Sequence, residues 1–97
     1  MYDRELAVQM VKTRLDMMHA MRERDEYITA RVDAAAAELE AYGIHLREED
    51  PQDLMLLIDQ TVWEYGSRDK TGEMPEWLAK RRRDRWARET EAATDDP

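Results

Sequence analysis

The sequence predicts an all-α fold, a compact bundle of about four helices with a basic C-terminal helix and a short acidic tail. Apolar residues recur at intervals of three and four along most of the 97 residues, whereas no stretch keeps the two-residue period of a strand. The chain also contains only 3 Gly and 3 Pro. A chain of this length is one domain, expected at residues 1–89, followed by an acidic and disordered tail at residues 90–97.

The first helix is expected to begin after Asp3, because aspartate is a good N-cap residue. One face of this helix carries Val8, Val11, Leu15 and Met18. The charged run at residues 22–26 interrupts the pattern but contains neither Gly nor Pro. We favour a break there, with Asp25 capping the next helix. One continuous helix is the competing interpretation.

The second helix has the clearest pattern in the chain. Its apolar positions step by four, three, four and three, and they are Ile28, Val32, Ala35, Leu39 and Tyr42. Gly43 follows at the position where a left-handed residue ends a helix, and Ile44 provides the apolar contact of such an end. The pattern therefore predicts a helix that stops at Tyr42.

The third helix is predicted from residue 50 to about residue 68. Asp50 can cap it, and Pro51 suits the first helical position because its missing N–H has no intrahelical partner there. Apolar residues surround much of this helix, which is typical of burial on several sides. In so short a chain this favours contact with another subunit. The residues predicted at that subunit interface are Leu56, Trp63 and Tyr65.

The fourth helix is predicted to start at Pro75 and to carry most of the positive charge. Residues 1–78 have a net charge of −9, residues 79–88 of +5 and residues 89–97 of −4, within a total of −8. Leu78 and Trp86 share one face of this helix. The residues predicted to bind a partner are Trp77, Lys80, Arg81, Arg82, Arg83, Arg85, Trp86 and Arg88.

Residue types that would indicate an enzyme are scarce. The chain has no cysteine, and its two histidines, His19 and His45, do not have the spacing of a helical metal site. The carboxylates lie on polar faces or alternate with arginine, so we expect solvated side chains rather than a catalytic pair. We therefore expect no enzymatic activity, no metal and no cofactor. The longest apolar run, residues 54–58, is far below the ~20 residues that span a membrane, so no membrane contact is expected.

The basic helix allows three interpretations. It could contact an acidic protein surface, bind nucleic-acid phosphates as a small helical regulator through residues 80–88, or be a solvated helix balanced by the acidic body. Sequence-specific DNA readout is disfavoured, because residues 79–88 contain no Asn, Gln, Ser or Thr. All seven aromatic residues are Trp or Tyr, which are enriched at interfaces. Separate acidic and basic regions favour head-to-tail association of identical subunits.

Several short motifs follow one another in a characteristic order. They are DEYI at 25–28, AYGI at 41–44, DP at 50–51, WEYGSRD at 63–69 and GEMPEWL at 72–78. Over about residues 1–89 the chain resembles the small head–tail connector proteins, also called adaptor or head-completion proteins, of tailed bacteriophages and prophages.

This resemblance implies a structural role in the virion. Such subunits form a homo-oligomeric ring beneath the portal protein, extend the channel through which packaged DNA passes without sequence-specific binding, and support the next head-closure or tail component. The subunit would be made in the cytoplasm of the bacterial host and located at the head–tail junction. The C-terminal segment of such proteins engages the portal, which would assign that role to residues 77–89. This chain departs from the family in its arginine-dense last helix, which leaves portal, neighbouring subunit and DNA open as its partner.

Overall fold

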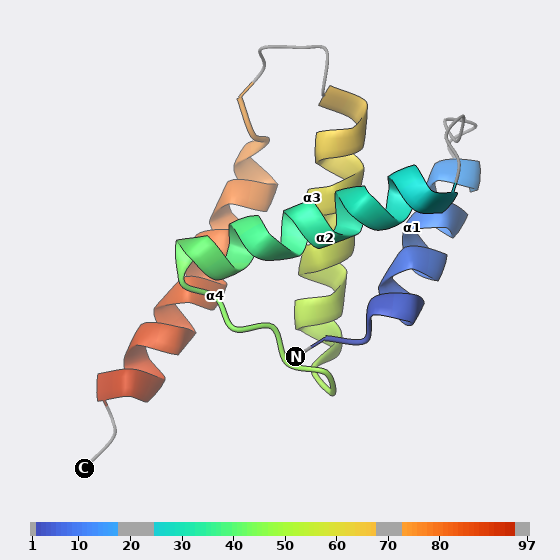
Figure 1. Ribbon diagram of the computed structural model, residues 1–97. Helices are drawn as coiled ribbons and strands as arrows, with labels where there is room; N and C mark the ends of the chain where they lie inside the picture. The colour runs from blue at the N-terminus through green and yellow to red at the C-terminus, as the bar shows by residue number, and fades with distance from the viewer. Residues whose placement is uncertain (1, 18–24, 68–72, 95–97) are drawn as a thin grey trace.

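The computed structural model of the chain describes residues 2–17, 25–67 and 73–94. In this part of the chain it contains four helices and no strand (Figure 1). The helices are α1 (Arg4–Met17), α2 (Asp25–Tyr42), α3 (Pro51–Ser67) and α4 (Glu76–Thr94). The predicted all-α fold of about four helices is therefore confirmed. α3 and α4 run in opposite directions, and α2 crosses the other helices (Figure 1).

α1 and α2 are two separate helices that pack against each other. α1 begins as expected, because the backbone N–H of Leu6 donates to Oδ1 of Asp3 at 3.1 Å. Arg4 in α1 donates to both carboxylate oxygens of Asp33 in α2, at 2.8 and 2.7 Å. In a continuous helix, these residues would lie about 44 Å apart at 1.5 Å per residue. The structure thus excludes the continuous helix, although residues 18–24 between the two helices lie outside the described residues.

Two details near this connection differ from the prediction. Asp25 is the first residue of α2 rather than the residue before it, and its carboxylate accepts a hydrogen bond from Nζ of Lys12 at 3.1 Å. The buried face of α1 consists of Ala7, Val11 and Leu15, whereas Val8 is partly buried. Met18, which was predicted on this face, lies outside the described residues.

The end of α2 forms the predicted motif in full. The N–H of Gly43 donates to the carbonyl of Glu40, and the N–H of Ile44 donates to the carbonyl of Leu39, each at 3.0 Å. These two bonds define a Schellman end, and Gly43 has the positive φ, 110°, that this end requires. Ile44 is fully buried, so the chain turns directly into the core. The buried residues of α2 are Ile28, Val32, Ala35, Ala36 and Leu39.

α3 is the central helix and packs against the other three. It starts as predicted, because Oδ1 of Asp50 accepts a hydrogen bond from the N–H of Gln52 at 2.9 Å. Most of its apolar surface is buried within the chain, which corrects the predicted subunit interface for Leu56 and Tyr65, whereas Met55 stays 36% exposed. Leu56 and Tyr65 are only 3% and 8% exposed and belong to the core, and Trp63 is partly buried against it.

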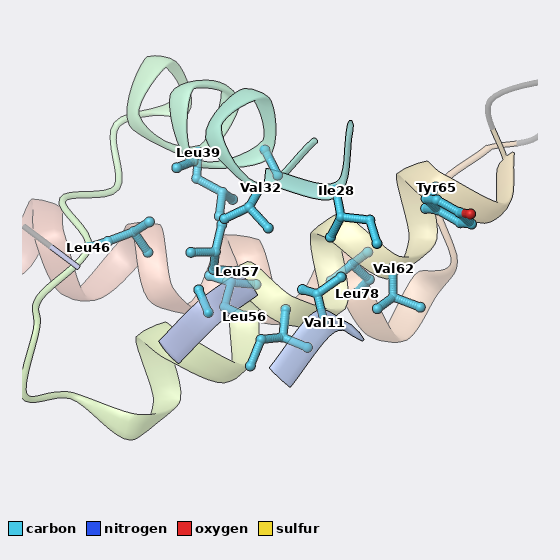
Figure 2. Packing of buried hydrophobic residues seen from close by; sticks show 14 of the residues in the cluster. Val11, Ile28, Val32, Leu39, Leu46, Leu56, Leu57, Val62, Tyr65 and Leu78 are labelled. Atoms are coloured by element: carbon cyan, nitrogen blue, oxygen red, sulfur yellow. The ribbon is translucent and has the colours of Figure 1, made fainter. Parts of the chain in front are cut away.

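The core lies between α1, α2 and α3, with smaller contributions from elsewhere. Figure 2 shows side chains of these helices converging, joined by Leu46 from the connection after α2 and by Leu78 from α4. The connection at residues 45–50 thus contributes to the core, since Leu46 is 8% exposed. Leu78 is the one side chain of the core cluster that α4 supplies among the described residues.

α4 continues further than predicted. The tail was expected to be disordered from residue 90, but the helix extends to Thr94, while residues 95–97 lie outside the described part. Adding residues to an existing helix is far easier than starting one, and Ala92 and Ala93 are strong helix formers. The C-terminal end of α4 extends away from the other helices (Figure 1), within a molecule that measures 49 × 29 × 20 Å.

Candidate functional site

α4 has one face turned toward the body and one toward solvent. Leu78 and Arg85 are seven residues apart, share a face and are both buried. Trp77, Lys80 and Arg83 are exposed. The basic helix predicted at residues 79–88 is therefore divided, and its positive side chains have different environments.

Arg85 is the most deeply buried of the predicted partner-binding residues, at 5% exposure, and it is bound inside the chain. Its Nε and Nη2 donate to the two carboxylate oxygens of Asp53 in α3, at 2.6 and 3.2 Å, and Asp53 is 1% exposed. Nη2 also donates to the carbonyl of His45 at 2.8 Å and to Glu89 at 3.0 Å. The hydrogen bond to Asp53 is the main cause that raises the pKa of Arg85. This arginine is not available to a partner, which corrects the prediction.

Glu89 completes the same cluster. Burial alone would raise the pKa of its carboxyl, but the hydrogen bond from the N–H of His45, at 3.1 Å, and the contact with Arg85 outweigh burial and lower it. Oδ2 of Asp53 also accepts from the N–H of Arg47 at 2.9 Å. The cluster therefore joins α3, α4 and the connection after α2.

Asp59 forms a second buried ionic cluster, and its carboxylate connects three helices. Its Oδ1 accepts from Nη1 of Arg14 in α1 at 3.0 Å, and its Oδ2 forms a short contact with Nη1 of Arg81 in α4. Asp59 itself is 5% exposed. Arg81 remains largely exposed and also lies over the ring of Trp77, 5.9 Å from its centre. Much of the guanidinium of Arg81 is thus open to solvent.

Aromatic contacts attach α4 to the end of α2. The guanidinium of Arg82 lies 4.3 Å from the ring centre of Tyr42, a cation–π distance, and the rings of Tyr42 and Trp86 meet edge to face at 6.4 Å. Trp86 also closes over Gly43, where an added Cβ would lie 3.0 Å from its Nε1. Trp86 is therefore a packing residue that keeps 44% of its surface exposed.

The remaining basic residues on α4 are on the solvent side. Lys80 pairs with Asp84 at 2.9 Å, and Arg83 pairs with Glu76 at 3.0 Å. In the described part of the chain Arg88 has no ion-pair partner. Most of the excess positive charge of residues 79–88 is consequently balanced by carboxylates of the same molecule.

A groove between α3 and α4 is the best-formed hollow beside the predicted site. Its volume is about 420 Å³, and we call it the α3–α4 groove. It is lined by Pro51, Gln52, Met55 and Leu56 of α3 and by Arg81, Asp84, Arg85 and Arg88 of α4. The floor is largely apolar and three arginines line the α4 side. Sequence reasoning missed Gln52 and Met55, because helical spacing shows that they share a face but not that this face meets α4.

A partly buried carboxyl group, that of Glu64 in α3, lies close to the exposed Glu38 of α2. Nε2 of Gln60 donates to Glu38 at 3.4 Å and to Glu64 at 3.1 Å, and Arg31 lies 3.5 Å from Glu64. Burial and the neighbouring carboxyl of Glu38 raise the pKa of Glu64 to about 7. From the sequence, solvated carboxylates were expected. The i,i+4 spacing of Gln60 and Glu64 was the available signal for the hydrogen bond between them.

Two further kinds of feature would indicate a function among the described residues, a metal-binding cluster and a membrane-spanning helix. Among those residues no three His, Cys, Asp or Glu side chains come together as a metal site, and no helix is both long and apolar enough to cross a membrane. His45 is exposed, and His19 lies outside the described residues. Comparison with protein-family models, curated proteins and solved structures found no match to this chain.

Proposed function

We propose that the chain is a structural protein of a phage or prophage virion, a head–tail connector subunit that assembles as a ring under the portal, extends the DNA channel and joins head to tail. It would be made in the host cytoplasm and act at the head–tail junction, with the portal, a head-closure or tail component, and other copies of itself as partners. It would have no enzymatic activity. The resemblance of residues 1–89 to connector proteins is the starting point of this proposal.

The observation that carries the proposal is the protruding helix α4 with exposed aromatic surface. Trp77 and Trp86 are 51% and 44% exposed, and α4 reaches beyond the other helices (Figure 1). Exposed tryptophan next to arginine is typical of protein–protein contact surfaces. The portal-facing surface is therefore assigned to Trp77, Trp86 and the solvent-side residues Lys80, Arg83 and Arg88, without the buried Arg85.

The ionic clusters count against the nucleic-acid-binding alternative. A phosphate-binding helix needs several unpaired cations, because affinity for DNA depends on how many phosphates the protein neutralises. On α4, Arg81 and Arg85 are paired with buried aspartates, and Lys80 and Arg83 with neighbouring carboxylates. This arrangement suits a protein that lies around DNA without binding it tightly.

The test is co-purification with the portal protein encoded in the same phage or prophage genome. We expect the full chain to bind assembled portal rings and to add a layer visible by negative-stain electron microscopy. Trp77→Ala should weaken this binding, whereas Met17→Ala, at an exposed apolar position on α1, should not. A genome without a portal gene, or portal rings that never retain the chain, would contradict the proposal.

A further inference from the structure

We propose that the α3–α4 groove receives the acidic C-terminal end of α4 from a second copy of this chain. The groove lies on one part of the molecule and the acidic end on another, so the contact is head-to-tail, and each copy can use both surfaces at once. Repetition of one such contact generates a ring when the rotation closes.

The groove combines a largely apolar floor with a wall on α4 that carries three arginines and Asp84. Asp84 is paired with Lys80 and Arg85 with Asp53, so the donors open to a ligand are those of Arg81 and Arg88. Met55 is 36% exposed on the floor, and Gln52 beside it offers an amide. On the wall, Arg88 has no ion-pair partner within the described residues. Arg81 uses one terminal nitrogen on Asp59, although a guanidinium has five N–H donors. The groove therefore presents spare donors that suit carboxylate acceptors, next to an apolar surface that suits small side chains.

The end of α4 has the complementary composition. Beyond Glu89, residues 90–97 carry Glu91, Asp95 and Asp96, contain no basic residue, and are otherwise Thr, Ala and Pro. This segment is therefore both acidic and rich in small side chains, as the groove requires.

Beyond Arg88, the axis of α4 runs away from the α3–α4 groove of the same molecule. Arg88 lines the groove, and the helix continues from there to Thr94, six residues or about 9 Å further along its axis. Figure 1 shows this end of α4 extending away from the other helices. The backbone of α4 up to Thr94 thus projects beyond its own groove, and a second copy offers an equivalent groove to the acidic segment.

This inference deepens the part of the proposed function in which copies associate, and it does not depend on the portal. The experiment measures self-association of the full chain by sedimentation velocity, at about 0.1 M and about 1 M salt, between which the Debye length falls from about 10 to about 3 Å. The groove variant is Arg88→Glu, and the end variant is Asp95→Arg with Asp96→Arg. The control is Arg47→Glu, an equal charge change at an exposed position outside the groove.

We expect the unaltered chain and the control to self-associate, more strongly at low salt. The groove variant and the end variant should each associate on the order of tenfold more weakly, because an attractive charge contact becomes repulsive. An equimolar mixture of the two variants should recover association, since each altered surface then meets an oppositely charged partner. Circular dichroism serves as the check that all variants remain helical.

Three results would overturn the inference. They are a chain that stays monomeric at every attainable concentration, variants that associate like the control, and a mixture that fails to recover association. Each differs from failure of the proposed function, which is loss of portal binding. A chain that binds portal rings but never self-associates through this groove would keep the connector function and remove the inference.

Discussion

Asp53 and Asp59 are buried carboxylates whose charge is balanced by arginines of α4. A buried ion pair contributes little compared with an apolar pair of the same size, because both ions lose their hydration. Removing one partner is different, since the other charge then stays buried and uncompensated. At the scale of single residues, these aspartates should therefore be the positions where small chemical changes have the largest effects on stability.

The change Asp53→Asn tests this. It leaves the buried guanidinium of Arg85 with Glu89 as its one remaining carboxylate partner among the described residues, and we expect the free energy of unfolding to fall by up to about 3–5 kcal/mol. Urea unfolding followed by circular dichroism measures the loss. The control Asp84→Asn breaks an exposed pair with Lys80 and should cost at most about 1 kcal/mol. Equal losses in the two variants would contradict this account.

Glu64 should make stability depend on pH in the opposite sense to an ordinary carboxylate. Its pKa in the folded chain is about 7, above the ordinary value of 4.5, so between these values the folded state binds more protons than the unfolded state. Its contribution is present below pH 4.5 and is lost as pH rises through about 7. We expect Glu64→Gln to reduce this dependence and to stabilise the chain most at alkaline pH. An NMR titration of the Glu64 carboxyl with a midpoint near 4.5 would refute the raised pKa and the pH dependence expected from it.

At the scale of elements, the end of α2 illustrates how a local motif also determines a tertiary contact. Gly43 ends the helix with a positive φ, and the missing side chain leaves space for the indole of Trp86. The same residue thus stops α2 and allows α4 to pack across its end. A substitution of Gly43 should therefore disturb both the end of α2 and the packing of α4 across it.

Gly43→Ala is therefore expected to cost more than backbone strain alone, which is about 1–2 kcal/mol for a non-glycine residue in this region. The added Cβ would also lie 3.0 Å from Nε1 of Trp86, so the ring must move. Thermal and urea unfolding measure the loss. In the background of Trp86→Phe, which has a smaller ring, the same change should cost less. A loss that is identical in both backgrounds would show that the contact with Trp86 is unimportant.

Helix boundaries were predictable where the signal in the sequence is local. Asp3, Gly43 and Pro51 mark helix boundaries through their own backbone preferences, and the structure has boundaries at these positions. The environment of Arg85 was not predictable, because its partner Asp53 lies 32 residues earlier and helical spacing does not show which faces meet. For the same reason Leu56 and Tyr65 were assigned to a subunit interface although they lie in the core.

At the scale of the whole molecule, the net charge of −8 conceals an internal balance. The acidic body supplies Asp53 and Asp59, and the basic helix supplies the arginines that neutralise them. Most of the positive charge of α4 is thus paired within the molecule, and only a few cations remain for an external partner. The remaining surface is acidic overall, which disfavours contact with DNA.

Binding to duplex DNA is therefore expected to be undetectable by fluorescence anisotropy at about 0.1 M salt, since few phosphates could be neutralised. The alternative of a nucleic-acid-binding helix predicts the opposite. With five or six phosphate contacts, log K would fall with log salt concentration at a slope of about −5. Observation of such a slope would favour the regulator over the connector.

The way α4 is attached to the body has a consequence for the order of folding. α4 gives the core cluster one apolar side chain among its described residues, Leu78, yet it provides the guanidinium partners of both Asp53 and Asp59. Without α4, Asp53 would lose the guanidinium of Arg85, and Asp59 would keep Arg14 alone. Deletion of α4 should therefore destabilise the other three helices, and on the ribosome these buried ion pairs can be completed only after α4 has emerged.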